Sequence, residues 1–247
     1  MVNVFEPRFE WLERVDSTNT HCMKKAQAGE PEGYVVAAFF QEQGRGQRGN
    51  TWESEDGKNL TFSLLLRPNF LRVEEQFSLS KVIALSICDW INLEGVKPRI
   101  KWPNDIFIGD KKVAGILIEN SFSGSTLDVS VIGIGLNLNQ NNFSTYLSNP
   151  TSMMKITGKQ YSPEVVLSEI AVSIQMRYLQ LKYGLKNKVD EDYITSLYRY
   201  NEFCNYSNSN GRFKAKIIDV KPTGELILET ESGELKSFGF KEVNFEI

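Results

Sequence analysis

The chain has 247 residues, of which 41% are hydrophobic, and its 28 basic and 31 acidic side chains leave a net charge of −3. These numbers fit one large domain, or a main domain with a small appendage, and they exclude a disordered chain or a fibre. The near balance of charge gives no general electrostatic reason for nucleic-acid binding. Three widely spaced cysteines (Cys22, Cys88 and Cys204) and a single histidine (His21) argue against a disulfide framework or a zinc site. Because there is no apolar leader and no long apolar run, we expect a cytoplasmic protein that does not span a membrane.

The N-terminal part of the chain predicts three strands and one short helix. We expect a strand over 11–15, a turn or helix N-cap over 16–19, and a short helix over 21–28. Residues 34–40 are apolar nearly throughout and rich in β-formers, which is typical of a strand buried on both faces. A further strand is expected over 59–67.

The middle of the chain predicts a helix followed by more strands. Apolar residues recur at helical spacing over 73–93, so we expect a packed helix there. Residues 99–119 predict two strands joined by a tight turn at Gly109-Asp110. Residues 127–139 predict one more strand, whose even spacing would place Asn137 and Asn139 on one face at its end.

The C-terminal part predicts a loop, two helices and a separate group of short strands. Polar composition indicates a loop over 140–150, which could become ordered only when a ligand binds. A helix is expected to begin at Pro163, after Ser162 at the N-cap position, and a second helix is expected around 192–200. The pattern beyond Phe203 indicates a small SH3-like barrel, so we place a main domain at 1–203 and the barrel at 204–247. The expected barrel strands are 212–220, 225–229, 234–238 and 242–245.

Residues 41–54 form a segment with three glycines and two arginines that directly follows the buried strand. The glycines tolerate positive φ, so the segment could turn its backbone N–H groups inward around an anion. The arginines would add guanidinium donors suited to phosphate or carboxylate oxygens. The alternative is a mobile surface loop with incidental arginines, and the segment taken alone favours this alternative. The residues concerned are Gly44, Gly46, Gly49, Arg45 and Arg48.

Four charged residues lie at or near the ends of expected strands, where α/β-type sheets tend to place ligand sites: Arg45, Lys101, Asp105 and Lys112. Lys101 could pair with a carboxylate or a phosphate, and Asp105 could hold Mg²⁺ or water. Taken singly, each is better explained as a surface salt-bridge residue. The chain has no GxxxxGK[ST] loop and only one histidine, so neither a P-loop nor a Ser-His-Asp set away from His21 is predicted.

Five motifs, taken together and in order, resemble those of the biotin–protein ligases. They are Ser17-Thr-Asn19, Gly44-Arg-Gly-Gln-Arg-Gly-Asn-Thr-Trp52, Lys101-Trp-Pro-Asn-Asp105, Lys112-Val-Ala-Gly-Ile-Leu-Ile-Glu119 and Gly133-Ile-Gly-Leu-Asn-Leu-Asn139, within a resemblance that covers about residues 10 to 245. The resemblance implies an α+β fold, with a mixed β-sheet catalytic domain of the class II synthetase type packed with helices, plus the small SH3-like barrel. It also implies a two-step reaction, in which biotin attacks ATP to give biotinyl-5′-adenylate and pyrophosphate, and a carrier lysine then attacks the mixed anhydride.

The resemblance further implies roles for individual residues. Lys112 should reach the reacting carbonyl and phosphate, Arg45 the adenylate or the biotin carboxylate, and Asp105 the Mg²⁺ ion or the incoming lysine, while Lys101 is the fourth catalytic candidate. The implied biotin-binding residues are Ser17, Thr18, Asn19, Gln41, Gly44, Arg45, Gly46, Lys112 and Gly115. The implied ATP- and adenylate-binding residues are Arg45, Gln47, Arg48, Trp52, Lys101, Asn104, Lys112 and Asn137. Core packing is the alternative role for Trp52 and Trp102. A plain helix cap is the other role for residues 17–19, and it can hold together with biotin binding.

The resemblance implies that the partner is a biotin carboxyl carrier domain of acetyl-CoA carboxylase or of another biotin-dependent carboxylase, and it leaves homodimerisation through a sheet edge open. Because only about ten residues precede the first expected strand, we expect the enzyme-only form without a DNA-binding domain. Gln47 and Asn50 stand where many bacterial family members carry arginine, so we expect modestly greater release of the adenylate. Two alternatives stay open: a lipoate–protein ligase, and a sensor module that binds biotin or nucleotide without catalysis.

Overall fold

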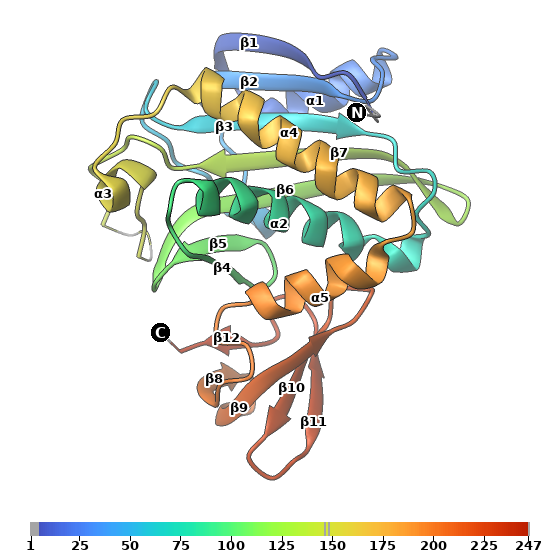
Figure 1. Cartoon of the computed structure of the whole chain (residues 1–247), viewed down its shortest axis with the longest axis vertical. Coiled ribbons are helices and arrows are strands. Elements are labelled where there is room, and N and C mark those ends of the chain that lie inside the picture. The colour runs from blue at the N-terminus through green and yellow to red at the C-terminus, as the bar shows by residue number, and fades with distance from the viewer. Residues whose placement is uncertain (1–4, 146, 148, 247) are drawn as a thin grey trace.

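The structure is a computed structural model that describes residues 5–145, 147 and 149–246, and two β-sheets carry its architecture (Figure 1). The larger sheet has seven strands in the order β1-β2-β3-β7-β6-β5-β4. Strands β1 and β2 are parallel, and all other neighbours in this sheet are antiparallel. The strands are β1 Arg8–Val15, β2 Tyr34–Gln41, β3 Leu60–Leu66, β4 Pro98–Lys101, β5 Asp105–Ile108, β6 Lys111–Ser123 and β7 Thr126–Leu136.

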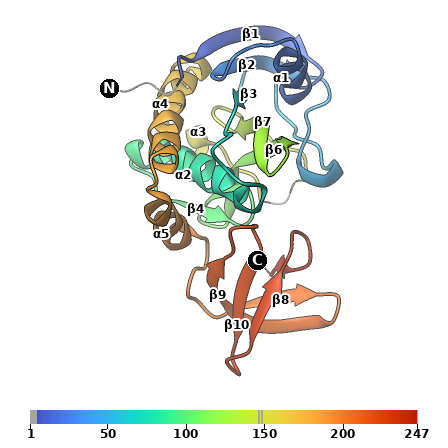
Figure 2. The same cartoon turned by 90° about the vertical axis from the view of Figure 1, so that its right-hand side faces the viewer.

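Helices cover one face of the large sheet and bury most of its apolar side chains (Figures 1 and 2). Helix α2 (Phe77–Leu93) packs on β4, β5 and β6, and α4 (Pro163–Lys182) packs alongside α2. Helix α5 (Lys186–Ser196) follows and also contacts α2. At the start of α4 the Ser162 side chain accepts a hydrogen bond from the Val165 N–H, with Pro163 in the first turn, so this helix begins where the sequence predicts.

The opposite face of the sheet carries α1 (Thr18–Gln27), which lies across from α2 and α4 in Figure 2. This helix packs against β2, β3 and β7 over a small apolar cluster that includes Cys22, Val36 and Leu65. Near the N-terminal end of α1 the sheet face is lined by polar and small residues instead, and a cavity lies there. A short helix, α3 (Met153–Thr157), follows the segment around 140–150. Across the described ranges, no helix is long and apolar enough to cross a membrane.

The smaller sheet is antiparallel throughout, with the order β11-β10-β9-β8-β12. It meets the main body at Trp102, whose buried indole N–H donates to the Gly224 carbonyl oxygen at 2.9 Å, and at the ring contact between Phe77 and Phe240. This sheet fits the small β domain expected at the C-terminal end, and the boundary between 203 and 204 stays a prediction. Its strands are β8 Cys204–Asn208, β9 Gly211–Val220, β10 Leu226–Thr230, β11 Leu235–Phe238 and β12 Asn244–Phe245.

The secondary structure differs from the expected elements in several places. Residues 99–119 contribute three strands rather than two, because residues 102–104 turn the chain back so that Lys101 pairs with Asp105. The second C-terminal helix, α5, begins at Lys186 rather than near 192. Strand β8 was not predicted, because Tyr206 is its one fully buried residue and so the strand shows no apolar alternation.

Candidate active site

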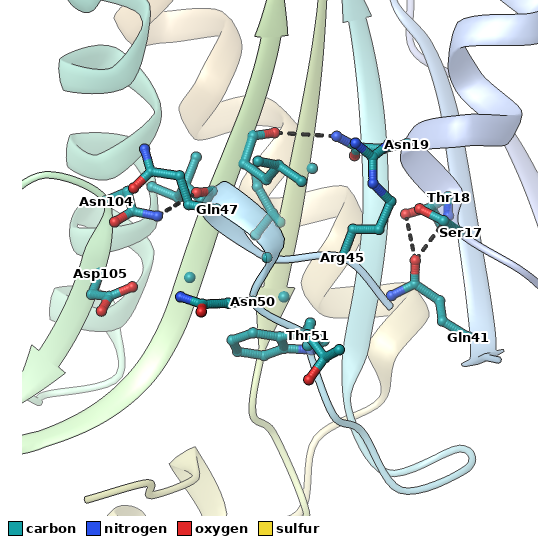
Figure 3. Close-up of a pocket in the computed structure, with 18 of the residues that line it drawn as sticks. Ser17, Thr18, Asn19, Gln41, Arg45, Gln47, Asn50, Thr51, Asn104 and Asp105 are labelled. Atoms are coloured by element: carbon teal, nitrogen blue, oxygen red, sulfur yellow. Dashed lines mark hydrogen bonds between the residues drawn. The ribbon is translucent and has the colours of Figure 1, made fainter. Parts of the chain in front are cut away.

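The site lies on the face of the large sheet that carries α1, at positions where strand β7 has no side chains (Figure 3). Along this face of β7 the residues change from Val131, under α1, to Gly133 and Gly135. A Cβ atom on Gly133 would lie 2.1 Å from Asn19 Oδ1, and one on Gly135 would lie 2.2 Å from Trp52 Cε2. The glycines are therefore required because a polar side chain and an indole ring stand directly on the strand.

A hydrogen-bond network fixes the N-terminal end of α1 against the sheet (Figure 3). Gln41, the last residue of β2, accepts with Oε1 from the backbone N–H of Thr18 at 2.8 Å and from its hydroxyl at 3.0 Å. The Ser63 hydroxyl on β3 lies 2.8 Å from Thr18 Oγ1 and 2.6 Å from Asn19 Oδ1, so its one proton is shared between two acceptors. The Asn19 amide in turn donates to Glu119 at 2.8 Å. Since residues 17–19 are buried, this end of the cavity is polar and closely held.

The glycine-rich segment folds into a narrow hairpin over the site, with a 3₁₀ turn (η1, Gln47–Gly49) at its tip. The backbone N–H of Trp52 donates to the Gly44 carbonyl oxygen at 2.8 Å, and the backbone N–H of Gly46 donates to the Asn50 carbonyl oxygen at 2.7 Å. The expectation that these N–H groups would turn inward around an anion was wrong for Gly46 and Trp52. Of the three glycines only Gly49 has positive φ, whereas Gly44 is needed because a Cβ there would lie 2.2 Å from the Trp52 carbonyl oxygen.

Arg45 reaches from the hairpin to strand β6, where its guanidinium forms a two-pronged ion pair with Glu119. The two hydrogen bonds measure 2.7 and 3.2 Å. The Arg45 side chain is 49% exposed and that of Glu119 is 28% exposed. Exposed ion pairs of this kind contribute about 0–1 kcal/mol. An anionic ligand could therefore take the place of Glu119 at little cost in stability.

Two adjacent cavities meet at the site. The first, of about 120 Å³, lies between the N-terminal end of α1, the hairpin and strands β6 and β7. The second, of about 530 Å³, lies between the hairpin, β5 and the residues Phe143, Leu147 and Pro150. The cavities have several lining residues in common, which form a shared wall, so a molecule bound in one would lie directly beside a molecule bound in the other. The residues that line both cavities are Asn50, Thr51, Trp52, Asp105 and Lys112.

An ion pair balances the charge of this shared wall. Lys112 Nζ lies 2.6 Å from Asp105 Oδ1 and 5.6 Å from the centre of the Trp52 ring. The pairing of β5 with β6 shifts register between Ile106 and Phe107, so that Lys112 lies opposite Phe107. Such irregularities re-aim side chains beside functional sites. The ammonium is thus held next to a carboxylate that it can exchange for a more strongly charged group.

Lys101 lies in the wall of the second cavity only, with Nζ 5.0 Å from the centre of the Phe107 ring. Burial is the main cause that lowers the pKa of Lys101, and the positive charges of Lys112 and Arg199 lower it further. The carboxylate of Asp105 acts in the opposite direction. A lysine with a lowered pKa in a cavity wall is typical of a functional site.

Two buried polar atoms in the cavity walls, Trp52 Nε1 and Asn137 Oδ1, have no hydrogen-bond partner within the described part of the chain. The amide nitrogen of Asn137 donates to the Thr151 carbonyl oxygen at 3.0 Å, which leaves its oxygen as a free acceptor. Asn104, by contrast, is satisfied by a bond of 2.8 Å to the Ile116 carbonyl oxygen. A buried donor or acceptor without a partner costs free energy, which a ligand with matching groups would recover.

Residues 11–137 match the protein family described as the biotin/lipoate A/B protein ligase family. The chain belongs to this family. It is 30% identical over 231 residues to the bifunctional ligase/repressor BirA of Bacillus subtilis, which covers 91% of this chain and 70% of that protein. It is 35% identical over 181 residues to the biotin–[acetyl-CoA-carboxylase] ligase of Paracoccus denitrificans, covering 70% of this chain and 74% of the relative. Its fold is similar to that of the biotin protein ligase from Aquifex aeolicus in complex with biotin and ATP, with a TM-score of 0.81 at 26% identity over 98% of this chain and 99% of that one.

The chain is therefore a ligase, and the resemblance drawn from its five motifs is confirmed. The α+β fold of the biotin protein ligases, with a small C-terminal β domain, is confirmed as well. Of the residues predicted for the ligase site, all but two line one of the cavities. Gly44 lines neither cavity, and the side chain of Arg48 lies outside the described residues. The individual roles of these residues in the ligase stay predictions.

Several residues around the cavities were given no individual role from the sequence. Ser63 and Glu119 bind Asn19 from strands whose neighbours only the fold reveals. Gly133 and Gly135 carried a readable signal, because alternate glycines on one strand mark a face where something approaches closely. The second cavity is further lined by Phe107, Phe143, Leu147 and Pro150, which come from separate segments.

The expectation for the end of strand β7 was wrong. Asn137 and Asn139 both lie beyond the last strand residue, Leu136. Asn137 borders the second cavity, whereas both the amide nitrogen and the amide oxygen of Asn139 are hydrogen-bonded to the backbone of Tyr161, at 2.7 and 2.9 Å.

Ser17 occupies the N-cap position of α1 but makes no side-chain cap bond. The plain helix-cap role is therefore not the one that its hydroxyl performs.

Replacing Ser63 by alanine should lower the free energy of unfolding by about 1–3 kcal/mol, because Asn19 Oδ1 would lose its donor in a buried position. Ser237→Ala is the matched control, since Ser237 is exposed on β11, and its effect should stay within about 0.5 kcal/mol. Denaturant unfolding of both variants measures the difference. Equal, small effects would contradict a network that holds α1 in place.

Proposed function

We propose that this ligase joins biotin to a protein lysine in two steps. Biotin is first activated with ATP to biotinyl-5′-adenylate, and the biotinyl group then passes to a lysine of a carrier domain. The observation that carries the proposal is the pair of cavities that share Trp52, Asp105 and Lys112 as one wall. Adenylation requires two molecules to be held in contact at one reacting centre. The first cavity would hold biotin, and the second would hold the nucleotide.

In the activation step, a carboxylate oxygen of biotin bonds to the α-phosphorus of ATP. The bond from that phosphorus to the β-phosphate bridging oxygen breaks, and pyrophosphate leaves. Negative charge crowds at this centre, so cationic donors fixed in advance lower the barrier. We assign Lys112, at the shared wall, to the reacting carboxylate and α-phosphate. Arg45 would contact the adenylate from the hairpin, and Lys101 would attract the phosphates from the second cavity.

In the transfer step, the nitrogen of the carrier lysine bonds to the biotin carbonyl carbon. The bond from that carbon to the adenylate oxygen breaks, and AMP leaves. The attacking amine must first lose a proton, and we assign Asp105, which lines both cavities, to attract the lysine and accept that proton. Asp105 becomes free for this role when Lys112, now 2.6 Å away, turns to the more negative adenylate. The hairpin over the first cavity would shield the mixed anhydride from water.

Mg²⁺ enters this proposal together with ATP. The described residues contain no group of three or more His, Cys, Asp or Glu side chains that could hold a metal ion. Mg²⁺ usually keeps water and phosphate ligands and takes only one or two carboxylates from the protein. Asp105, the carboxylate that lines both cavities, therefore fits the ion of MgATP. The bound ion would neutralise charge on the departing pyrophosphate.

The partner that fits this chemistry is a biotin carboxyl carrier domain of acetyl-CoA carboxylase or of another biotin-dependent carboxylase. Support comes from the Paracoccus relative, whose name states acetyl-CoA carboxylase as its substrate. We place this activity in the cytoplasm. We also propose a homodimer through strand β1, which lies at one end of the strand order and pairs only with β2 among the described strands. An edge strand can pair through its outer backbone groups with a second copy of the chain.

Isotope exchange between ATP and pyrophosphate should depend strictly on biotin, because the first step is reversible and needs the acid. Lipoate is the matched control acid, since the family includes lipoate ligases. Exchange with lipoate alone would overturn the choice of biotin. Binding of biotin and ATP without any exchange would point to a sensor that does not catalyse the reaction.

Lys112→Ala should slow adenylate formation by more than about tenfold, or roughly 1.4 kcal/mol, because the reacting centre loses its nearest cation. Lys111→Ala is the matched control: it is the exposed neighbour on the same strand and lines neither cavity. Single-turnover formation of the adenylate measures both variants, with circular dichroism to check folding. An unchanged rate in a folded Lys112→Ala enzyme would remove Lys112 from the reacting centre.

ATP affinity should fall with rising pH earlier than an ordinary lysine would allow. Lys101 attracts phosphate only when protonated, and burial lowers its pKa, so the cation is present below that pKa and lost as pH rises through it. Lys101→Arg keeps its charge at any working pH and should extend ATP binding to higher pH. Calorimetric titration from neutral pH to about pH 10 measures both proteins. The same alkaline limit in both would contradict the assignment.

A further inference from the structure

Lys101 differs from the other cations of the site in what holds it. Arg45 and Lys112 each have a carboxylate partner, at 2.7 and 2.6 Å. Within the described part of the chain, no carboxylate oxygen lies within 4.0 Å of Lys101 Nζ. The ammonium instead lies beside two aromatic rings, 5.0 Å from the centre of Phe107 and 5.5 Å from the centre of Phe245.

The two rings come from different sheets. Phe107 belongs to β5 of the large sheet and is buried, whereas Phe245 belongs to β12 of the small sheet. Phe245 pairs in register with Tyr206 on β8, and the two rings lie 5.1 Å apart. The backbone N–H of the next residue, Glu246, donates to the Asn205 carbonyl oxygen at 3.1 Å. The Glu246 carbonyl oxygen accepts from the Arg199 guanidinium at 2.8 Å. The position of the Phe245 ring is therefore set by the small sheet.

A ring suits Lys101 better than a carboxylate would. The face of an aromatic ring attracts a cation within about 6 Å, and more strongly when water is excluded. This attraction opposes the cost of burying the ammonium, to which Lys112 and Arg199 add repulsion and Asp105 adds attraction. A carboxylate in contact with Lys101 would also compete with phosphate oxygens for its N–H donors. The rings leave those donors free.

We propose that Phe245 is a positioning residue of the ligase, whose ring holds the Lys101 ammonium at the wall of the second cavity so that it can meet the phosphates of ATP. The small β domain would thereby complete the ATP site without touching ATP. This inference rests on the proposed function, because it takes ATP to be the occupant of the second cavity.

Biotin-dependent exchange between ATP and pyrophosphate tests this role in the full chain. Phe245→Leu should raise the KM for ATP about fivefold or more, as expected for the loss of a desolvated cation–π contact, and leave the KM for biotin unchanged. Phe245→Tyr keeps the ring face and should have the same KM for ATP as the unaltered enzyme. Phe213→Leu is the matched control, because Phe213 also packs on Tyr206, at 6.0 Å, but has Lys236 rather than Lys101 near its ring.

A second measurement keeps the proposal testable if Phe245→Leu does not fold. Fluorinated phenylalanines at position 245 weaken the negative ring face and keep its shape, so the KM for ATP should rise with each added fluorine. A flat KM across that series, or equal changes for ATP and biotin, would overturn the proposal, as would an equal effect of Phe213→Leu. Absence of biotin-dependent exchange in the unaltered enzyme would overturn the proposed function instead.

Discussion

The large sheet can carry both a core and a site because its two faces differ in packing. The face under α2 and α4 carries the apolar core and with it most of the hydrophobic stabilisation. On the opposite face the apolar packing under α1 ends at Val131, because the next two residues of β7 on this face, Gly133 and Gly135, have no side chain. A strand loses packing at each such glycine, and it stays in place because it is central in the sheet and hydrogen-bonded on both sides, to β3 and β6. Stability and function are thus separated across the thickness of one sheet.

The cations of the site fall into two groups, which differ in what each cation contacts before a ligand binds. Arg45 and Lys112 lie in partly exposed ion pairs, which contribute little to stability and can be exchanged for ligand oxygens at little cost. Lys101 is partly buried before any ligand binds, this burial lowers its pKa, and two aromatic rings lie beside its ammonium. In the proposed reaction, part of the exclusion of water from the phosphates of ATP would therefore be complete once the chain has folded. The remainder would come with ligand binding, when the two ion pairs would exchange partners.

The sequence was most informative where the signal runs along the chain. The apolar run over 34–40 became β2, and the Ser162-Pro163 pair marked the start of α4 correctly. The motifs brought together nearly all of the predicted site residues, because each motif sits on one strand end or one hairpin. Contacts between distant strands could not be predicted in this way. Ser63 joins the network only because β3 lies beside β7 and under α1, and β8 has one buried residue, too few to show a period. The glycines at 44 and 46 were expected to be needed for positive φ, but neither has it, and close approach of the backbone is the reason for Gly44.

Trp52 makes the two cavities interdependent. Its backbone closes the hairpin on Gly44, its ring stands on Gly135, and its indole N–H is buried without an acceptor within the described part of the chain. A ligand in either cavity that supplies an acceptor would remove a penalty of about 1–3 kcal/mol and hold the ring more firmly. Because the ring and the hairpin are one unit, the same contact would also fix Arg45 over the first cavity. Lys112, beside that ring, would then face a wall with fewer alternative positions. Binding energy from the first molecule would in this way prepare the site for the second, without any movement of the sheet beneath it.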